Sequence, residues 1–279
     1  MTGKIFKQFR EGKNLSTQAA AEIISPQFLR KYEKNQSDIR LTNLLQLLNR
    51  INVTIEEFTA EIENSLDYWM LEIESRIDQA YHAGNSFQLK KFIEEQEENY
   101  HQTKELRFCL IALVGQYYYN LIFLPKYVAD LSPIKDYLRE TESWGTFELF
   151  LVTYVSHIFH AEEAFLYAVQ LLKKQGGSIE VQKWRYDAIL HLVLLLLNQN
   201  HLEHAQKLMS LFFSHRQANP HLKFIHHDLY AKFVNGLLLI KLGEVKGKED
   251  CERVIQIFVE DLGYADYGNR LNILYQTFI

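Results

Sequence analysis

The chain of 279 residues has few of the residues that interrupt helices or cross-link loops. It contains four prolines, twelve glycines and two cysteines, and the cysteines share no motif. Two unrelated cysteines exclude a fold that depends on several disulfide bonds. Strict alternation of apolar and polar residues is also hard to find, so the pattern favours long helices over sheets. We therefore predict an all-α protein.

Long hydrophobic runs are lacking as well. The most apolar runs, such as 108–114 and 192–197, are shorter than the roughly 20 residues that cross a bilayer as a helix. The N-terminus is polar and does not resemble a signal peptide. We therefore expect a cytoplasmic protein that does not bind a membrane.

Sequence motifs of catalysis are missing too. The sequence has no glycine-rich phosphate loop, no nucleophile elbow and no Cys-His framework, so we predict that the protein is not an enzyme and has no cofactor. His157, His160 and Glu163 recur at intervals of three residues, which could form a metal-binding helix face. No zinc-type motif accompanies them, and we expect no metal site.

Charge is distributed unevenly along the chain. The net charge is −5, but residues 1–50 carry nine Lys or Arg against four acids, which leaves −10 for the remainder. A basic head on an acidic body is typical of a nucleic-acid-binding module fused to another domain. A solvated basic surface alone could give the same count.

The stretch 25–35 has the pattern of a short helix with two different faces. Ser25 is a good N-cap, and Pro26 suits the first helical position. At 100° per residue, Phe28, Leu29 and Tyr32 fall in a narrow apolar arc. The opposite side carries an amide and three cations: Gln27, Arg30, Lys31 and Lys34. We predict that this side faces the major groove of double-stranded DNA.

Four more short helices surround this one in the first sixty residues. The first is expected to bury Ile5, Phe6 and Phe9 and to expose Lys7, Arg10 and Lys13. A second helix, 17–23, follows Ser16, and a fourth carries leucines between positions 41 and 51. Thr54 and Glu57 form a capping box that starts a fifth helix. Five short helices with a tight turn between the second and third predict a helix-turn-helix domain.

The order of these residues resembles the Cro/repressor-type helix-turn-helix family. The similar residues are 18–21, Ser25, Leu29, 32–33 and 52–58, within a match over residues 1–61. The resemblance implies that Gln18 binds a phosphate. It implies that the base-reading positions are Pro26, Gln27, Arg30 and Lys31, with Lys34 suited to phosphate. The chain departs from the family at Asn35, where glycine is frequent, but asparagine tolerates positive φ. It departs also at Pro26, which offers no side-chain hydrogen bond.

Beyond residue 64 the chain becomes a series of longer amphipathic segments with short connections. We expect helices at 65–83, 87–99, 104–124, 134–142, 147–159, 161–174, 181–198, 202–217, 227–242, 248–262 and 267–278. This order predicts stacked antiparallel helix pairs, an α-solenoid of degenerate tetratricopeptide-like repeats with a concave face. The predicted domains are 1–64, a DNA-binding helix-turn-helix domain, and 65–279, a helical-repeat domain for ligand binding and dimerisation.

The second domain resembles the Rgg family of Gram-positive transcription regulators. The resemblance rests on Trp144-Gly145 with 147–149, on 247–250 with 255–258, and on Leu262-Gly263. It implies a cytoplasmic homodimer that regulates transcription in quorum sensing. In that family the helical repeats bind a short hydrophobic signalling peptide in their concave face, which alters promoter activity.

Five residues are candidates for binding such a peptide. They lie at positions similar to those that bind the peptide in the Rgg family: Tyr154, His157, His191, Phe233 and Asn235. Each could instead be a buried group that contacts a neighbouring helix. His157 and His191 could also make peptide binding or dimer packing sensitive to pH. The alternative hypothesis is a helical-repeat scaffold for protein–protein interaction that no peptide controls.

Overall fold

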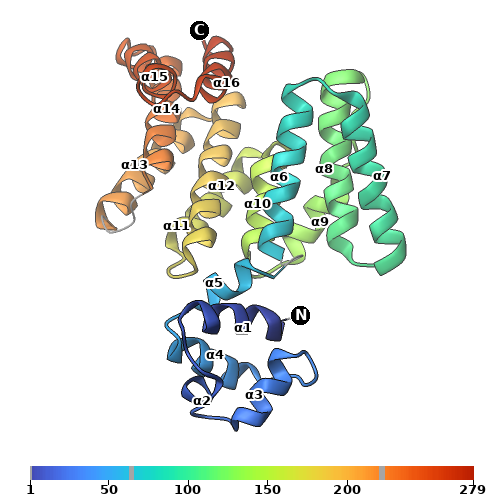
Figure 1. The fold of residues 1–279 in the computed structure, drawn as a ribbon. Helices are drawn as coiled ribbons and strands as arrows, with labels where there is room; N and C mark the ends of the chain where they lie inside the picture. Colours follow the sequence, from blue (N-terminus) through green and yellow to red (C-terminus); the bar gives the residue numbers. More distant parts are fainter. Residues whose placement is uncertain (1, 63–65, 220–223) are drawn as a thin grey trace. The chain divides into compact units, whose positions relative to one another are not determined.

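The computed structural model describes residues 2–62, 66–219 and 224–279, and these residues form helices without any β-strand (Figure 1). The all-α prediction is confirmed. The chain divides into two compact units, residues 1–83 and 84–279, which we call the head unit and the repeat unit. Residues 63–65 lie outside the described part, so the domain boundary after residue 64 stays a prediction.

The head unit begins with the five short helices that the sequence predicts. They are α1 (Thr2–Gly12), α2 (Thr17–Ala20), α3 (Pro26–Glu33), α4 (Leu41–Arg50) and α5 (Ile55–Ala60), and α6 (Leu66–His82) follows them. Helix α2 ends three residues earlier than expected, because Ala21 leaves helical geometry with ψ 38°. Thr54 and Glu57 form the predicted capping box of α5.

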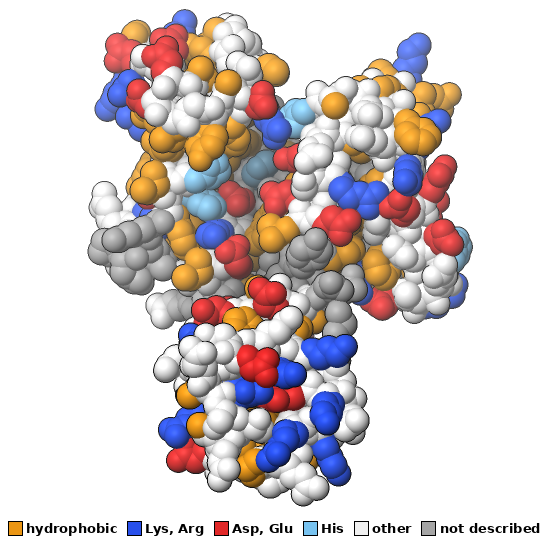
Figure 2. Space-filling view, viewed as in Figure 1, with side chains coloured by type: hydrophobic (Ala, Val, Ile, Leu, Met, Phe, Trp, Pro, Cys, Tyr) orange, Lys and Arg blue, Asp and Glu red, His pale blue; other side chains and the backbone are white. Residues whose placement is uncertain are grey.

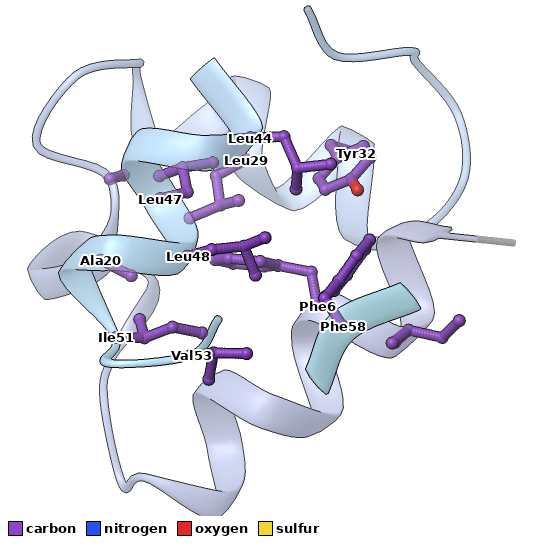
Figure 3. Packing of buried hydrophobic residues seen from close by; sticks show 12 residues of the cluster. Phe6, Ala20, Leu29, Tyr32, Leu44, Leu47, Leu48, Ile51, Val53 and Phe58 are labelled. Atoms are coloured by element: carbon purple, nitrogen blue, oxygen red, sulfur yellow. The ribbon is translucent and has the colours of Figure 1, made fainter. Parts of the chain in front are cut away.

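Apolar side chains from all five helices meet in one core. Phe6, Leu48 and Phe58 lie at its centre and point toward one another (Figure 3). From α3, Leu29 and Tyr32 are 0% and 2% exposed. Burying such side chains stabilises the fold by roughly 1.5–3 kcal/mol each, so the inner face of α3 is fixed by the core.

A close contact between α1 and α3 depends on Gly3 and Asn35. A Cβ atom at Gly3 would lie 1.8 Å from the carbonyl oxygen of Tyr32. Asn35 has φ 55°, as predicted for this turn, and its Oδ1 accepts a hydrogen bond of 3.1 Å from the Gly3 amide. Only glycine at position 3 allows the two backbones to approach so closely.

The prediction that Arg10 is exposed is wrong. Its side chain is buried, and its Nε and Nη2 donate to the Glu33 carboxylate at 2.6 and 2.9 Å. Its Nη1 donates to the Leu15 carbonyl at 2.6 Å. The guanidinium thus joins α1 and α3 to the segment before α2, and it is not available to an external anion.

The repeat unit consists of longer helices (Figure 1). They are α7 (Ser86–Thr103), α8 (Leu106–Phe123), α9 (Ser132–Glu140), α10 (Thr146–Val155), η1 (Ser156–Ile158), α11 (Ala161–Lys173), α12 (Ile179–Asn198), α13 (Leu202–Ala218), α14 (Ile225–Lys241), α15 (Lys246–Gln256), the π-helical turn η2 (Ile257–Asp261) and α16 (Ala265–Gln276). These helices pack on helices one or two places away along the chain, such as α7 on α8, α10 on α12 and α14 on α15. Their order and bounds agree with the predicted segments to within a few residues.

Helix α8 is longer and more apolar than the run 108–114 suggested. By length and composition alone, its 18 residues could cross a membrane. The helix nevertheless packs against α7, α9 and α10, and Gly115 lets the side chains of Phe92 and Ile93 approach closely. The packing buries 39% of these 18 residues.

Candidate nucleic-acid interface and ligand-binding face

The sequence starts α3 sharply at the predicted residue. The Oγ atom of Ser25 accepts a hydrogen bond of 3.1 Å from the amide of Phe28, and Pro26 occupies the first turn. Because proline needs no amide partner there, the helix begins without an unsatisfied donor from that residue. The N-terminal half of α3 is therefore well defined.

The outer face of α3 is exposed and cationic. Its exposed side chains are those of Gln27, Arg30, Lys31 and, at the C-cap, Lys34. Within the described ranges, no carboxylate oxygen lies within 4 Å of Lys31 or Lys34. The Nε atom of Arg30 donates to the Pro26 carbonyl at 3.2 Å, which orients its guanidinium along the helix. Figure 2 shows blue side chains gathered on the head unit. These charges are free to meet phosphates or base edges.

The remaining predicted DNA contacts differ in exposure. Gln18 lies in the first turn of α2 and is exposed, and Ser16 caps that helix by accepting from the Ala19 amide at 3.1 Å. Helix α2 packs against α3, so Gln18 belongs to an element next to the cationic face. Pro26 is half-buried and presents only its ring.

In the repeat unit, Tyr154 and His157 lie beside tyrosines of α8. The hydroxyl of Tyr118 donates to the Tyr154 carbonyl at 3.3 Å, and the imidazole of His157 stacks on Tyr117 with 4.3 Å between ring centroids. The side chain of His157 is exposed, but desolvation by its surroundings lowers its pKa. This shift favours the neutral form of the imidazole.

The spacing of His157, His160 and Glu163 does not produce one helix face. The chain leaves helical geometry at Phe159, and His160 becomes the N-cap of α11, with its amide donating to Glu163 at 3.1 Å. The Glu163 carboxylate also binds Lys135 at 2.9 Å and Arg139. In the part of the chain that the structure describes, no three His, Cys, Asp or Glu side chains are grouped to hold a metal ion.

Three further candidates lie on α12 and α14. His191 is half-buried, with its ring centroid 6.2 Å from that of Tyr230. Asn235 is also half-buried. Phe233 is 0% exposed and belongs to the core between α14 and its neighbours, so its side chain lines no surface in this structure. The candidates thus form two groups, one beside α8 and one where α12 meets α14.

A polar cluster that sequence reasoning missed lies next to His191. Asp187 precedes His191 by one helical turn, and its Oδ2 lies 3.3 Å from Nε2 of His227 on α14. The ring of His226 is 5.1 Å from that of Tyr267 on α16. Near α12 and α14, Figure 2 shows histidines next to acidic and hydrophobic side chains. The spacing of Asp187 and His191 was the available signal, since residues four apart share a helix face.

Several solved structures have the same fold along their whole length. The SHP pheromone receptor Rgg2 from Streptococcus dysgalactiae is 21% identical and superposes with a TM-score of 0.76 over 99% of this chain and 100% of that chain. A putative transcriptional regulator from Listeria monocytogenes EGD-e is 17% identical, with a TM-score of 0.77 over 99% and 96%. A bacterial peptide pheromone/receptor complex is 14% identical, with a TM-score of 0.72 over 99% and 98%.

Two family models match the two parts of the sequence. Residues 6–58 match a helix-turn-helix model, which covers α3 and the core around it. Residues 88–270 match the model of the C-terminal domain of the HTH-type transcriptional regulator Rgg. This second match covers more than half of the chain and extends from α7 to α16. The chain therefore belongs to the Rgg family of HTH-type transcriptional regulators.

Proposed function

We propose that the chain is a cytoplasmic, homodimeric regulator that binds a specific promoter sequence and responds to a short hydrophobic peptide. The exposed polar face of α3 carries the DNA-binding part of this proposal. Its backbone is fixed by the Ser25 cap and by the buried side chains of Leu29 and Tyr32. A rigid helix that presents an amide and three cations suits recognition in the major groove.

Each residue of this face suits a different DNA contact. Gln27 can bond adenine through two hydrogen bonds, and Arg30 or Lys31 can bond O6 and N7 of guanine. Gln18 and Lys34 are suited to phosphates, which fix the position of the helix without reading sequence. Pro26 can make only apolar contacts. Base discrimination then rests on Gln27, Arg30 and Lys31.

Dimerisation follows from the small size of the head unit. One helix-turn-helix domain contacts a short half-site with modest affinity. Two such domains linked in a dimer bind the full site more tightly than either domain binds its half-site. The expected target is an inverted repeat with half-sites about one helical turn apart. Binding should weaken steeply with salt, because each phosphate contact releases counterions.

The proposal that a peptide controls this regulator rests on its membership of the Rgg family and on the polar groups of the repeat unit. Two of the similar structures are described as a pheromone receptor and as a peptide pheromone/receptor complex. Extended peptides require apolar subsites and a few polar groups for their backbone and termini. We assign this role to the half-buried or exposed candidates Tyr154, His157, His191 and Asn235. Catalysis has no part in this function.

Comparison of promoter DNA with random DNA tests the proposal. The expected result is preferential promoter binding that the double variant Arg30→Ala, Lys31→Ala loses while its helical content is unchanged. Equal binding of both DNAs would contradict regulation by sequence. Unchanged promoter binding by the double variant would contradict DNA recognition through α3. Binding of neither DNA by the wild type would favour the alternative, in which the repeats act as a protein-binding scaffold.

A further inference from the structure

Asp187 is a half-buried carboxylate without a strong cation partner. Its side chain is 28% exposed, and its one ion-pair contact among the described residues is the 3.3 Å approach to His227. No Lys or Arg nitrogen of the described ranges lies within 4 Å of it. His227 is buried, and its own Nδ1 has no hydrogen-bond partner within the described residues. Because a desolvated charge is costly unless it is paired, this carboxylate favours an added cation.

Aromatic rings lie near the His227 side of the same carboxylate. His226 stacks near Tyr230 with centroids 6.5 Å apart, and its ring lies 5.1 Å from that of Tyr267. Burial raises the pKa of Tyr267 and the negative charge of Asp187 raises it further, while the positive charge of Arg270 lowers it, so both charges act on this ring. Aromatic faces attract cations electrostatically, so these rings add to the preference for positive charge.

An apolar cavity of about 320 Å³ adjoins this cluster. It is lined by Ile225, His226, Leu229, Phe258, Leu262, Tyr264 and Tyr267. His226 and Tyr267 therefore belong to both the polar cluster and the cavity. Ile225 is 71% exposed and Leu262 is 49% exposed, so the cavity opens to solvent through apolar side chains. Among the described residues that line it, none is Lys, Arg, Asp or Glu.

We propose that this region binds the amino terminus of an apolar peptide, with the ammonium at Asp187 and the first side chain in the cavity. The inference rests on the proposed peptide control and adds the orientation and the terminal chemistry of the ligand. An α-ammonium is attached to the same carbon as its own side chain. Asp187 reaches the cavity through His227, whose ring lies 5.4 Å from that of the lining residue His226. An anionic subsite this near to an apolar cavity fits a terminal residue better than a lysine, whose charge lies at the end of a long chain.

The test uses three pools of synthetic hexapeptides built from Leu, Ile, Val, Phe and Ala. One pool has free amino termini, one is N-acetylated, and one is N-acetylated with a single lysine. Each is mixed with the purified full chain, and the retained peptide is measured by mass spectrometry after gel filtration. The expected result is at least about tenfold greater retention of the free pool, the scale of one charge-assisted hydrogen bond. Asp187→Asn should remove this preference.

Two control pairs separate the site from general effects on folding. Glu180→Gln removes an exposed carboxylate from the same helix and should leave retention unchanged. Leu262→Lys places a charge at the cavity mouth and should reduce retention, whereas Leu166→Lys, at a leucine that is likewise exposed on α11, should not. A preference for the free pool that survives in Asp187→Asn would overturn the inference.

Three other outcomes would also count against the inference that the amino terminus binds at Asp187. Equal retention of the free and acetylated pools would overturn the inference alone and leave peptide control standing. Retention of the acetylated lysine pool at the level of the free pool would overturn the assignment to an amino terminus. Retention of no pool would overturn the inference together with the proposed peptide control.

Discussion

The head unit and the repeat unit arrange their polar groups in opposite ways. The head displays its functional charges on one exposed helix face and buries a single ion pair among its described residues, Arg10–Glu33, behind it. The repeat unit instead brings a carboxylate, imidazoles and tyrosines together between α12, α14 and α16, with His227 buried and Asp187 half-buried. The head can meet a large polyanion without rearrangement. The repeat unit suits a small ligand that replaces water around desolvated groups.

The largest expected effect is on stability. Breaking the buried ion pair of the head unit should lower the free energy of unfolding much more than breaking an exposed ion pair of the repeat unit. Glu33→Gln leaves the Arg10 guanidinium buried without a counter-charge, which should cost about 3–5 kcal/mol in the free energy of unfolding. Glu180→Gln, which breaks an exposed pair with Lys183, should cost less than about 1 kcal/mol. Chemical denaturation of both variants measures the difference. Equal losses in the free energy of unfolding would contradict the distinction between the buried pair of the head unit and the exposed pair of the repeat unit.

The next effect concerns the outer face of α3. Arg30→Ala and Lys31→Ala should each weaken specific DNA binding by about 1–3 kcal/mol and relax base preference. Lys34→Ala should weaken binding to all sequences alike and reduce the salt slope by about one. Fluorescence anisotropy at several salt concentrations measures both. If Lys34→Ala changes base preference, the division between reading and positioning residues is wrong.

A smaller effect is expected from pH in the repeat unit. Burial tends to raise the pKa of Glu163, but hydrogen bonds from Arg139, Lys135 and the His160 amide outweigh it and hold the pKa at about 2. Because this folded value lies below the ordinary value of 4.5, the carboxylate stabilises the fold above about pH 4.5. The contribution, about 1–2 kcal/mol after allowance for partial exposure, is lost as the pH falls from 4.5 toward 2.

Thermal unfolding of the wild type and of Glu163→Gln across this pH range measures the contribution. The two stability curves should converge at low pH and separate near neutrality. Parallel curves would show that Glu163 does not hold α9 and α11 together through its charge.

The smallest effect tests the start of α3. Ser25→Ala removes the cap on the Phe28 amide and should destabilise the head by about 1 kcal/mol. Ser178→Ala removes the equivalent cap of α12, which accepts from the Val181 amide at 3.2 Å, and should cost a similar amount. Only Ser25→Ala should weaken DNA binding. A loss of DNA binding in both variants would indicate coupling between the units instead.

Helix periodicity predicted the head more fully than the repeat unit, and the reason is geometric. The cap at Ser25 and the cationic face from Gln27 to Lys34 involve neighbouring residues, so local spacing is sufficient to recognise them. Arg10 was misassigned because its partner, Glu33, lies 23 residues away and only the packing of α1 on α3 brings them together. Periodicity grouped Arg10 with Lys7 and Lys13, which are exposed, but could not reveal that the Arg10 guanidinium alone is buried against Glu33.

The repeat unit illustrates the same limit more strongly. Its helix order was predictable, because long apolar segments and short connections are local features. The position of Phe233 in the core was not, since an aromatic residue on an amphipathic helix suits a core and a binding surface equally. Asp187 and His227 meet across 40 residues, and no local pattern indicates that contact.

Selection of binding sites from a pool of random DNA duplexes by the purified full chain tests the central claim most directly. We predict enrichment of an inverted repeat whose half-sites lie about one helical turn apart. The Arg30→Ala, Lys31→Ala double variant, folded as judged by its helical content, should enrich no such sequence. Enrichment of the same repeat by this variant, or of no sequence by the wild type, would contradict recognition of DNA by α3.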